Sequence, residues 1–181
     1  MTDLTIGDTP AADATVRLAA TGDTDAFARL VERHHASMAR VAYAVCGDAE
    51  SARDATQAAW TIAWRRLHTL RDHGQVRAWL VAIAANEARQ VVRKRGRAIV
   101  VDISETLDAA PGGDPADRID AVDLARALAG LKPDDRAVLA LRFVAGLDST
   151  EIAAQLHLSP SGVRSRLARL IERLRTELDH A

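Results

Sequence analysis

The spacing of apolar residues along the first half of the chain predicts three helices. In the first helix, from about Asp25 to Cys46, the positions that share one face are mainly apolar. These positions are Phe27, Leu30, Val31, His34, Met38 and Val41. The second helix carries Ala55, Ala59, Ile62, Ala63 and Leu67, and the third, from about Val76, carries Trp79, Leu80, Ile83, Ala84, Val91 and Val92. Gly47 suits the end of the first helix, and Asp48 suits the cap of the second.

Four shorter helical segments are predicted in the last third of the chain. They cover about 121–130, a stretch after Pro133, the run "STEIAAQL" and a stretch after Pro160. Both prolines suit the first turn of a helix, where a missing N–H costs little. Asp148, followed three residues later by Glu151, is typical of a helix start, and Ser159 can cap the last segment.

Between these two helical parts the composition changes. The run "VDISETLDAAPGGDPADRIDAVD" holds two prolines, two adjacent glycines and seven acidic residues, with Arg118 as its only base. Such a segment buries too little apolar surface to fold, so it predicts a flexible linker, either a solvated tether or a mimic of nucleic acid. We therefore expect an all-α fold of two small helical domains joined by a flexible acidic linker. The expected boundaries are a partly disordered leader at 1–22, a first domain at 23–97, the linker at 98–120 and a second domain at 121–181.

The composition agrees with a helical fold. Of 181 residues, 48% are hydrophobic but only 3% are aromatic, a balance that favours helices over a β-rich fold. The formal net charge of −1 does not by itself indicate nucleic acid, although charge can be segregated along a chain. The single cysteine, Cys46, lies in an apolar run and is expected to be a buried small side chain. No apolar run is long enough to cross a bilayer and the N-terminus lacks a signal-peptide pattern, so we expect a cytoplasmic protein without membrane insertion.

The stretch "STEIAAQLHLSPSGVRSRLARL" predicts a helix-turn-helix. Its expected core consists of Leu147, Ile152, Ala153, Leu156 and Leu158 from the first part, and Val163, Leu167, Leu170, Ile171 and Leu174 from the second. Ser161, Arg164, Ser165 and Ala168 then point outward, with Arg166 and Arg169 on the flanks. Because arginine pairs with guanine and with phosphate, this face is expected to bind DNA. The alternative is the solvated face of an ordinary helical hairpin.

Four stretches of this chain resemble bacterial RNA polymerase sigma factors of the extracytoplasmic-function (ECF) type. "TGDTDAFARLVERHH", "ARDATQAAWTIAWRRL" and "WLVAIAANEARQVVRKRGR" are similar to sigma region two, with Ala52, Asp54, Gln57, Trp79, Leu80, Ile83, Ala84, Asn86 and Arg93 at the family's motif positions. "LAGLKPDDRAVLALRFVAGLDSTEIAAQLHLSPSGVRSRLARL" is similar to region four. The chain departs from the family pattern at Arg53, Ala58, Leu70, Val76, Gln90, His157 and Gly162.

The resemblance implies three sets of site residues. Binding to the clamp helices of the polymerase is implied for Asp54, Gln57, Arg53 and Arg65, although the first two could instead form an ordinary solvated face. Contact with the minus-ten promoter element is implied for Asn86, Arg89, Arg93, Lys94, Arg95 and Arg97. Contact with the minus-thirty-five element is implied for Ser159, Ser161, Arg164, Ser165, Arg166 and Arg169. The loop from Leu67 to Val76, with Asn86 and Arg89 nearby, is the implied pocket for an unstacked base, and it contains no aromatic residue.

The function predicted from these features is that of an alternative sigma factor, with core RNA polymerase and both double-stranded and melted promoter DNA as partners. An anti-sigma factor is a further candidate partner. The main alternative is a stand-alone helix-turn-helix regulator, which would bind two half-sites as a dimer without polymerase. A pure interaction protein, a helical adaptor with no DNA role, is disfavoured by the two basic stretches and by the predicted recognition helix. No catalytic motif, cofactor motif or metal-ligand set stands out, and Trp60, Trp64 and Trp79 have core spacing.

Overall fold

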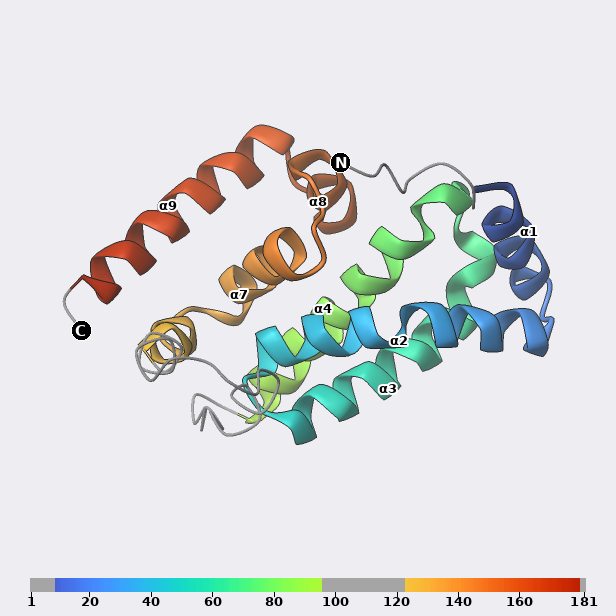
Figure 1. The fold of residues 1–181 in the computed structure, drawn as a ribbon, viewed down its shortest axis with the longest axis horizontal. Helices are drawn as coiled ribbons and strands as arrows, with labels where there is room; N and C mark the ends of the chain where they lie inside the picture. The colour runs from blue at the N-terminus through green and yellow to red at the C-terminus, as the bar shows by residue number, and fades with distance from the viewer. Residues whose placement is uncertain (1–8, 96–122, 180–181) are drawn as a thin grey trace, which may run out of the picture.

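The computed structural model describes residues 9–95 and 123–179, and every regular element in these ranges is helical (Figure 1). The first half contains α1 (Thr9–Ala20), α2 (Thr24–Cys46), α3 (Ala49–Arg66), two short 3₁₀ turns, η1 (Leu67–Thr69) and η2 (His73–Gln75), and α4 (Val76–Arg95). In the second half, residues 123–129 are helical and are followed by α7 (Pro133–Leu139), the π-helical turn η3 (Ala140–Val144), α8 (Ser149–Leu156) and α9 (Pro160–Leu178). The all-α fold class is confirmed. The expected linker and residues 1–8 lie outside the described residues.

Capping residues define the helix boundaries of the first half. The side chain of Asp23 accepts a hydrogen bond from the N–H of Ala26 at the start of α2. Gly47 ends α2 with a φ of 82°, a left-handed conformation that glycine adopts without steric cost. Asp48 then caps α3 by accepting from the N–H of Ser51 at 2.7 Å. The predicted stop at Gly47 and start at Asp48 are confirmed.

The helices α2, α3 and α4 pack side by side around an apolar core that includes Met38, Ala59 and Leu80, and α1 covers one end of them (Figure 1). Helix α1 lies within the stretch 1–22 that was expected to be a partly disordered leader, and it buries Val16 and Ala19 against the core. A short helix of this kind gains most of its stability from tertiary packing, which a local sequence pattern reveals only weakly.

In the second half, α8 and α9 form the predicted helix-turn-helix. Asp148 accepts hydrogen bonds from the N–H groups of Thr150 and Glu151, and the Glu151 side chain accepts from the N–H of Asp148, so the predicted capping pair is confirmed. His157 ends α8 with a φ of 56°. Ser159 caps α9 by accepting from the N–H of Gly162 at 3.0 Å.

Most of the expected core residues of the helix-turn-helix are buried, but two apolar side chains that were expected in the core, one in this motif and one in α3, are exposed. Leu158 was expected in the core and is 42% exposed, because it follows the left-handed residue His157 in the turn. Trp64 was also expected in the core and is 41% exposed; its ring packs edge-on against Phe27, with ring centroids 4.8 Å apart. Trp60 and Trp79 are partly buried against the core.

The two halves of the chain pack directly against each other. Helix α7 and the turn η3 contact α2 and α4, and α8 contacts α4. Fully buried residues of the second half, such as Val138, Leu141 and Leu147, belong to the same continuous core as those of α2 and α4. Helix α9 lies on the outer side, away from α2, α3 and α4 (Figure 1). The sequence predicted two helical domains but not this contact between them.

Candidate nucleic-acid interface

The first basic surface lies along one face of α4. Asn86, Arg89 and Arg93 are three or four residues apart and therefore share one face of the helix. Asn86 and Arg93 are exposed and Arg89 is half-buried. Lys94 is exposed in the last turn, where a cation also interacts favourably with the helix dipole. These side chains are therefore close enough to contact one stretch of backbone phosphates.

Two other predicted members of this set are not at the same surface. The guanidinium of Arg95 turns toward the start of α3, where it donates to the hydroxyl of Ser51 and lies 3.5 Å from Asp48. It also lies 3.7 Å from Glu50. Arg97 lies outside the described residues. The structure thus separates Arg95 from Arg89 and Arg93, because its side chain serves the α3–α4 packing.

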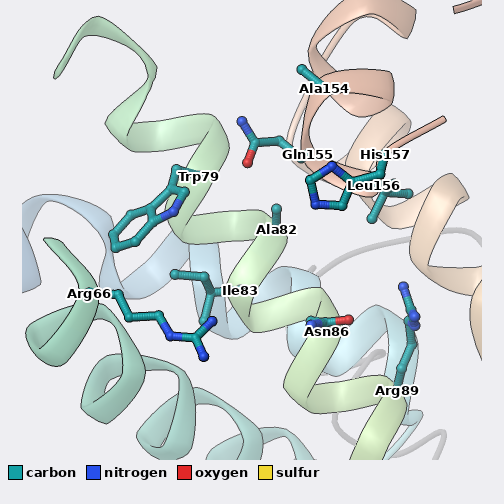
Figure 2. A pocket seen from close by; sticks show the side chains of 10 residues that line it. All are labelled: Arg66, Trp79, Ala82, Ile83, Asn86, Arg89, Ala154, Gln155, Leu156 and His157. Carbon is teal, nitrogen blue, oxygen red and sulfur yellow. The ribbon is translucent and has the colours of Figure 1, made fainter. Parts of the chain in front are cut away.

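A cavity of about 400 Å³ lies between α4 and α8 (Figure 2). Its lining residues from the first half are Arg66, Trp79, Ala82, Ile83, Asn86 and Arg89, and those from the second half are Ala154, Gln155, Leu156 and His157. Figure 2 shows the side chain of Gln155 on α8 and the ring of His157, the residue that follows α8, turned toward α4. Asn86 and Arg89 are brought together as predicted, but the loop from Leu67 to Val76 contributes no residue to this cavity.

Arg89 and Arg93 are paired with a residue of the second half of the chain. The Nε of Arg89 lies 2.8 Å from Oδ1 of Asp134, which forms an ion pair. The Nη2 of Arg93 donates to both carboxylate oxygens of Asp134 at 2.8 Å. Asp134 stands in the first turn of α7, where a carboxylate is also favoured by the helix dipole. This contact is not evident from the sequence, because Arg93 and Asp134 are 41 positions apart in the chain.

The second basic surface lies on α9. Ser161, Arg164, Ser165, Ala168 and Arg169 are exposed at positions that follow one side of the helix, as predicted. Ser159 is engaged as the cap of α9. The Nε of Arg166 donates to Asp135 of α7 at 2.8 Å, so this side chain is turned inward rather than toward the exposed face.

Two apolar grooves were missed by the sequence analysis. One, of about 830 Å³, runs between α2 and α3, and its lining includes Arg53 and Gln57 together with His35, Tyr43 and Trp60. The other groove, of about 420 Å³, lies between the helix at 123–129, α7 and α9. Its larger apolar lining residues include Leu124, Leu128, Leu139, Phe143, Ile171, Leu174 and Leu178. Phe143 is 63% exposed at its edge. Val144 and Ala44 line both grooves, which makes them neighbours on the surface.

The predicted polymerase-binding residues are all exposed on α3. Asp54, Gln57, Arg53 and Arg65 point away from the core. Arg53 and Gln57 reach the groove between α2 and α3, whereas Asp54 and Arg65 do not line it. The signal for this groove in the sequence was weak, since several of its lining residues are alanines, among them Ala39, Ala44 and Ala52.

Three ionisable side chains are buried in or beside the core. Burial raises the pKa of the Cys46 thiol to about 12, and the Sγ lies 3.9 Å from the carbonyl oxygen of Ala88. Burial lowers the pKa of His34, with the positive charges of Arg33 and Arg77 acting in the same direction. Burial also lowers the pKa of Arg136. No group of three metal-ligating side chains occurs in the ranges that the structure describes.

Comparisons with known proteins bear on both basic surfaces. Residues 30–98 match the family described as sigma-70 region 2, and residues 121–174 match sigma-70 region 4. The α4 face therefore lies in the region 2 match and the α9 face in the region 4 match. No helix in the described part of the chain is long and apolar enough to span a membrane.

Individual relatives cover nearly the same part of the chain. The chain is 30% identical to the ECF RNA polymerase sigma factor SigL of Mycobacterium tuberculosis over 88% of its length and 93% of SigL. It is 32% identical to the probable RNA polymerase sigma factor RfaY of Xanthomonas campestris, but spans only 42% of that protein. The solved structure of CnrH in complex with the cytosolic domain of CnrY is 27% identical, with a TM-score of 0.70 over 94% of this chain and 98% of CnrH. The CnrH sequence comes from Cupriavidus metallidurans.

Proposed function

The chain belongs to the ECF RNA polymerase sigma factors, and we propose that it directs core RNA polymerase to promoters by contacting two DNA elements at once. The observation that carries this proposal is the pair of basic helix faces, one on α4 within the region 2 match and one on α9 within the region 4 match. A protein that bound a single operator would need only one of them.

We assign minus-thirty-five recognition to α9. Its N-terminal half offers Ser161, Arg164 and Ser165 on the exposed face, and the major groove is wide enough to admit a helix. The small serines allow a close approach, and the arginine can donate two hydrogen bonds to a guanine. Arg169, one turn further on, is placed to meet the phosphate backbone.

We assign the minus-ten element to α4. Arg89, Arg93 and Lys94 supply positive charge for phosphates, and Asn86 supplies a side-chain amide that can donate and accept hydrogen bonds to an unpaired base. The scarcity of aromatic residues limits base stacking as a source of binding energy. We therefore expect promoter opening to depend on polar contacts and on the polymerase.

We propose that core polymerase docks on the groove between α2 and α3. Its apolar floor provides buried area, and Arg53 and Gln57 at its edge provide polar contacts. Asp54, exposed on the same helix, lies close enough to extend that contact. Since sigma factors are initiation factors, we assign catalysis to the polymerase, and the proposed function places the chain in the cytoplasm with it.

A protein partner that holds the sigma factor is also proposed. CnrH has been solved with the cytosolic domain of CnrY, and the resemblance to ECF factors implies an anti-sigma factor for this chain as well. The exposed apolar side chains around Phe143 provide a surface that such a partner could cover.

Reconstituted transcription tests the proposed function. The purified chain is mixed with sigma-free bacterial core polymerase and genomic DNA, and the transcript ends are mapped. We expect co-elution with core polymerase and starts at discrete sites that share two sequence elements. Failure to bind core polymerase, combined with tight binding of a dimer to an operator, would replace this proposal with a stand-alone regulator.

Matched variants sharpen that experiment. Arg164→Ala should reduce initiation at every site, whereas Arg175→Ala, also an exposed arginine but in the last turn of the same helix, should leave initiation unchanged. Equal effects of the two substitutions would argue against recognition by the N-terminal half of α9.

A further inference from the structure

The groove between the helix at 123–129, α7 and α9 has apolar walls that remain open to solvent. Leu124 and Leu128, and likewise Leu174 and Leu178, are four residues apart and share one face of their helix. Phe143 is 63% exposed and Leu178 is 38% exposed, so the described part of the chain leaves this edge of the groove uncovered. The volume of about 420 Å³ is in the usual range for small-molecule sites, about 300–1,000 Å³.

A buried cation lines the same groove. Arg136 of α7 is only 2% exposed, and its Nε and Nη2 atoms have no hydrogen-bond partner within the described part of the chain. In arginine these two nitrogens direct parallel N–H groups from one edge of the planar guanidinium, and this edge binds the two oxygens of a carboxylate. Buried donors without an acceptor cost free energy, which an acceptor that enters the groove recovers.

The residues around Arg136 supply no negative charge to it. Among the described residues that line the groove, the other charged one is Arg175, which is also a cation. Its contact with Glu172 is 3.8 Å long and joins two exposed side chains, so it is weak. The Cys46 thiol is near enough to interact electrostatically with Arg136, but its pKa of about 12 keeps it neutral at physiological pH. The groove thus combines apolar walls with an uncompensated positive charge.

A purely structural role for Arg136 would call for an acceptor inside the fold. Arg142, in the turn that continues α7, has such an acceptor, since its Nη1 donates to the backbone carbonyl of Leu147 at 3.1 Å. Arg166 likewise finds the carboxylate of Asp135. The Nε and Nη2 of Arg136 have neither kind of partner in the described residues, which favours an acceptor that comes from outside the chain.

We propose that this groove binds a fatty acid, with the carboxylate on the Nε and Nη2 of Arg136 and the alkyl chain along Leu128, Leu139 and Leu174. A single alkyl chain is thin enough to enter between the three helices. A helix of a partner protein is about 10–12 Å across and would instead rest on the edge near Phe143. The site requires neither promoter DNA nor polymerase, so it goes beyond the proposed function.

One consequence concerns the protein partner proposed above for the surface around Phe143. A fatty acid in the groove occupies the apolar residues beneath that surface, so the two occupants should compete. This consequence rests on the proposed function, whereas the binding site itself does not.

Binding of decanoate to the full chain tests the site, with 1-decanol as the matched ligand that lacks a carboxylate. Isothermal titration calorimetry is carried out below the concentration at which either compound aggregates. We expect decanoate to bind the parent on the order of tenfold more tightly than 1-decanol, because only the carboxylate can satisfy the buried guanidinium. Arg136→Met should weaken decanoate binding by a similar factor and leave 1-decanol binding unchanged. Arg17→Met, which removes an exposed arginine of α1 that does not line the groove, should bind both ligands like the parent.

A second measurement locates the ligand and needs no variant at Arg136. In methyl NMR spectra of the parent, decanoate should shift the resonances of Leu128, Leu139 and Leu174, and leave those of Val16 and Leu80 in place. Thermal unfolding of Arg136→Met without ligand shows whether the variant is folded. We expect that it is, because replacing a buried, unpaired cation by an apolar side chain of similar length removes a desolvation cost.

Three results would overturn the site. They are equal affinities of the parent for decanoate and 1-decanol, equal decanoate affinities of Arg136→Met and Arg17→Met, and methyl shifts outside the groove. Absence of decanoate binding also overturns it and leaves the groove as a surface for a protein partner. None of these assays contains DNA or polymerase, so a failure of reconstituted transcription would contradict the proposed function and leave the fatty-acid site standing.

Discussion

The carboxylate of Asp135 on α7 accepts a hydrogen bond from the Nε of Arg166 on α9 at 2.8 Å, and both side chains are largely buried, at 15% and 26% exposure. The pair joins two helices of the second half 31 residues apart in the chain. Arg166 therefore orients α9 on its support, whereas Arg164, two residues earlier, is exposed and is the residue that we propose contacts DNA.

This difference predicts opposite effects for two neighbouring arginines. Arg166→Ala should lower the free energy of unfolding by about 1 kcal/mol, because it leaves Asp135 without its partner. Arg164→Ala should leave the stability unchanged and weaken promoter binding by about 1–3 kcal/mol, because it removes a base contact. Urea unfolding measures the stability of the two variants, and promoter binding by the polymerase holoenzyme measures their affinity for DNA. A stability loss in Arg164→Ala would contradict the assignment.

A double-mutant cycle tests the cap of α9. A Cβ added at Gly162 would lie 2.9 Å from Oγ of Ser159, the atom that caps the helix, so the substitution must displace the hydroxyl. We expect Gly162→Ala not to stabilise the native chain, although alanine is the better helix former by about 1 kcal/mol. In a Ser159→Ala background, where no cap remains, the same substitution should stabilise by about 0.5–1 kcal/mol. Thermal unfolding of the parent, the two single variants and the double variant measures the coupling between the two substitutions. Additive effects of the two substitutions on stability would contradict the prediction.

Stability above neutral pH should depend on Cys46. The pKa of the buried thiol is raised to about 12, so the unfolded chain loses this proton first as the pH rises beyond the ordinary thiol range. The contribution of the thiol to the free energy of unfolding is complete below the ordinary value of 9.0 and declines between 9.0 and about 12. Cys46→Ala should therefore show a shallower decline over that interval in urea unfolding. Identical slopes in the two proteins would be inconsistent with a buried neutral thiol.

His34 should lower the stability on the acidic side, where the free energy of unfolding should fall as the pH falls. Its pKa is lowered from 6.5 by burial and by Arg33 and Arg77, so the folded chain binds the proton less well than the unfolded chain. Stability should fall as the pH drops below 6.5. His34→Gln, which keeps a polar side chain of similar size but cannot titrate, should flatten this part of the profile. Direct titration by NMR gives an independent check, and a pKa above 6.5 would contradict the prediction.

The N-terminal helix α1 provides a test of packing. Val16 is fully buried between α1 and the core, so Val16→Ala should lower the free energy of unfolding by about 1–2 kcal/mol. Leu18→Ala, on the exposed side of the same helix, is the matched control and should change it by less than about 0.5 kcal/mol. Equal stabilities of the two variants would mean that α1 does not pack on the core in solution.

Local sequence signals determined the elements and the two basic faces. Gly47 and Asp48 placed a helix boundary to the residue, and the Asp148–Glu151 pair and Ser159 placed two more, because capping depends on side chains within three positions of the backbone groups they satisfy. Apolar spacing in α9 predicted which serines and arginines would be exposed, because the helical period alone decides which positions share a face.

Other features arose only from tertiary packing. Helix α1 forms because Val16 and Ala19 find the core, and Leu158 and Trp64 stay partly exposed because the neighbouring helices leave them uncovered. Arg95 and Arg166 are as basic as Arg164, yet each turns toward a carboxylate at another helix. The role of Asp134 is the clearest case. In the sequence it is one acid after a proline, and only the fold brings it to Arg89 and Arg93, since an ion pair depends on distance in space and not on separation along the chain.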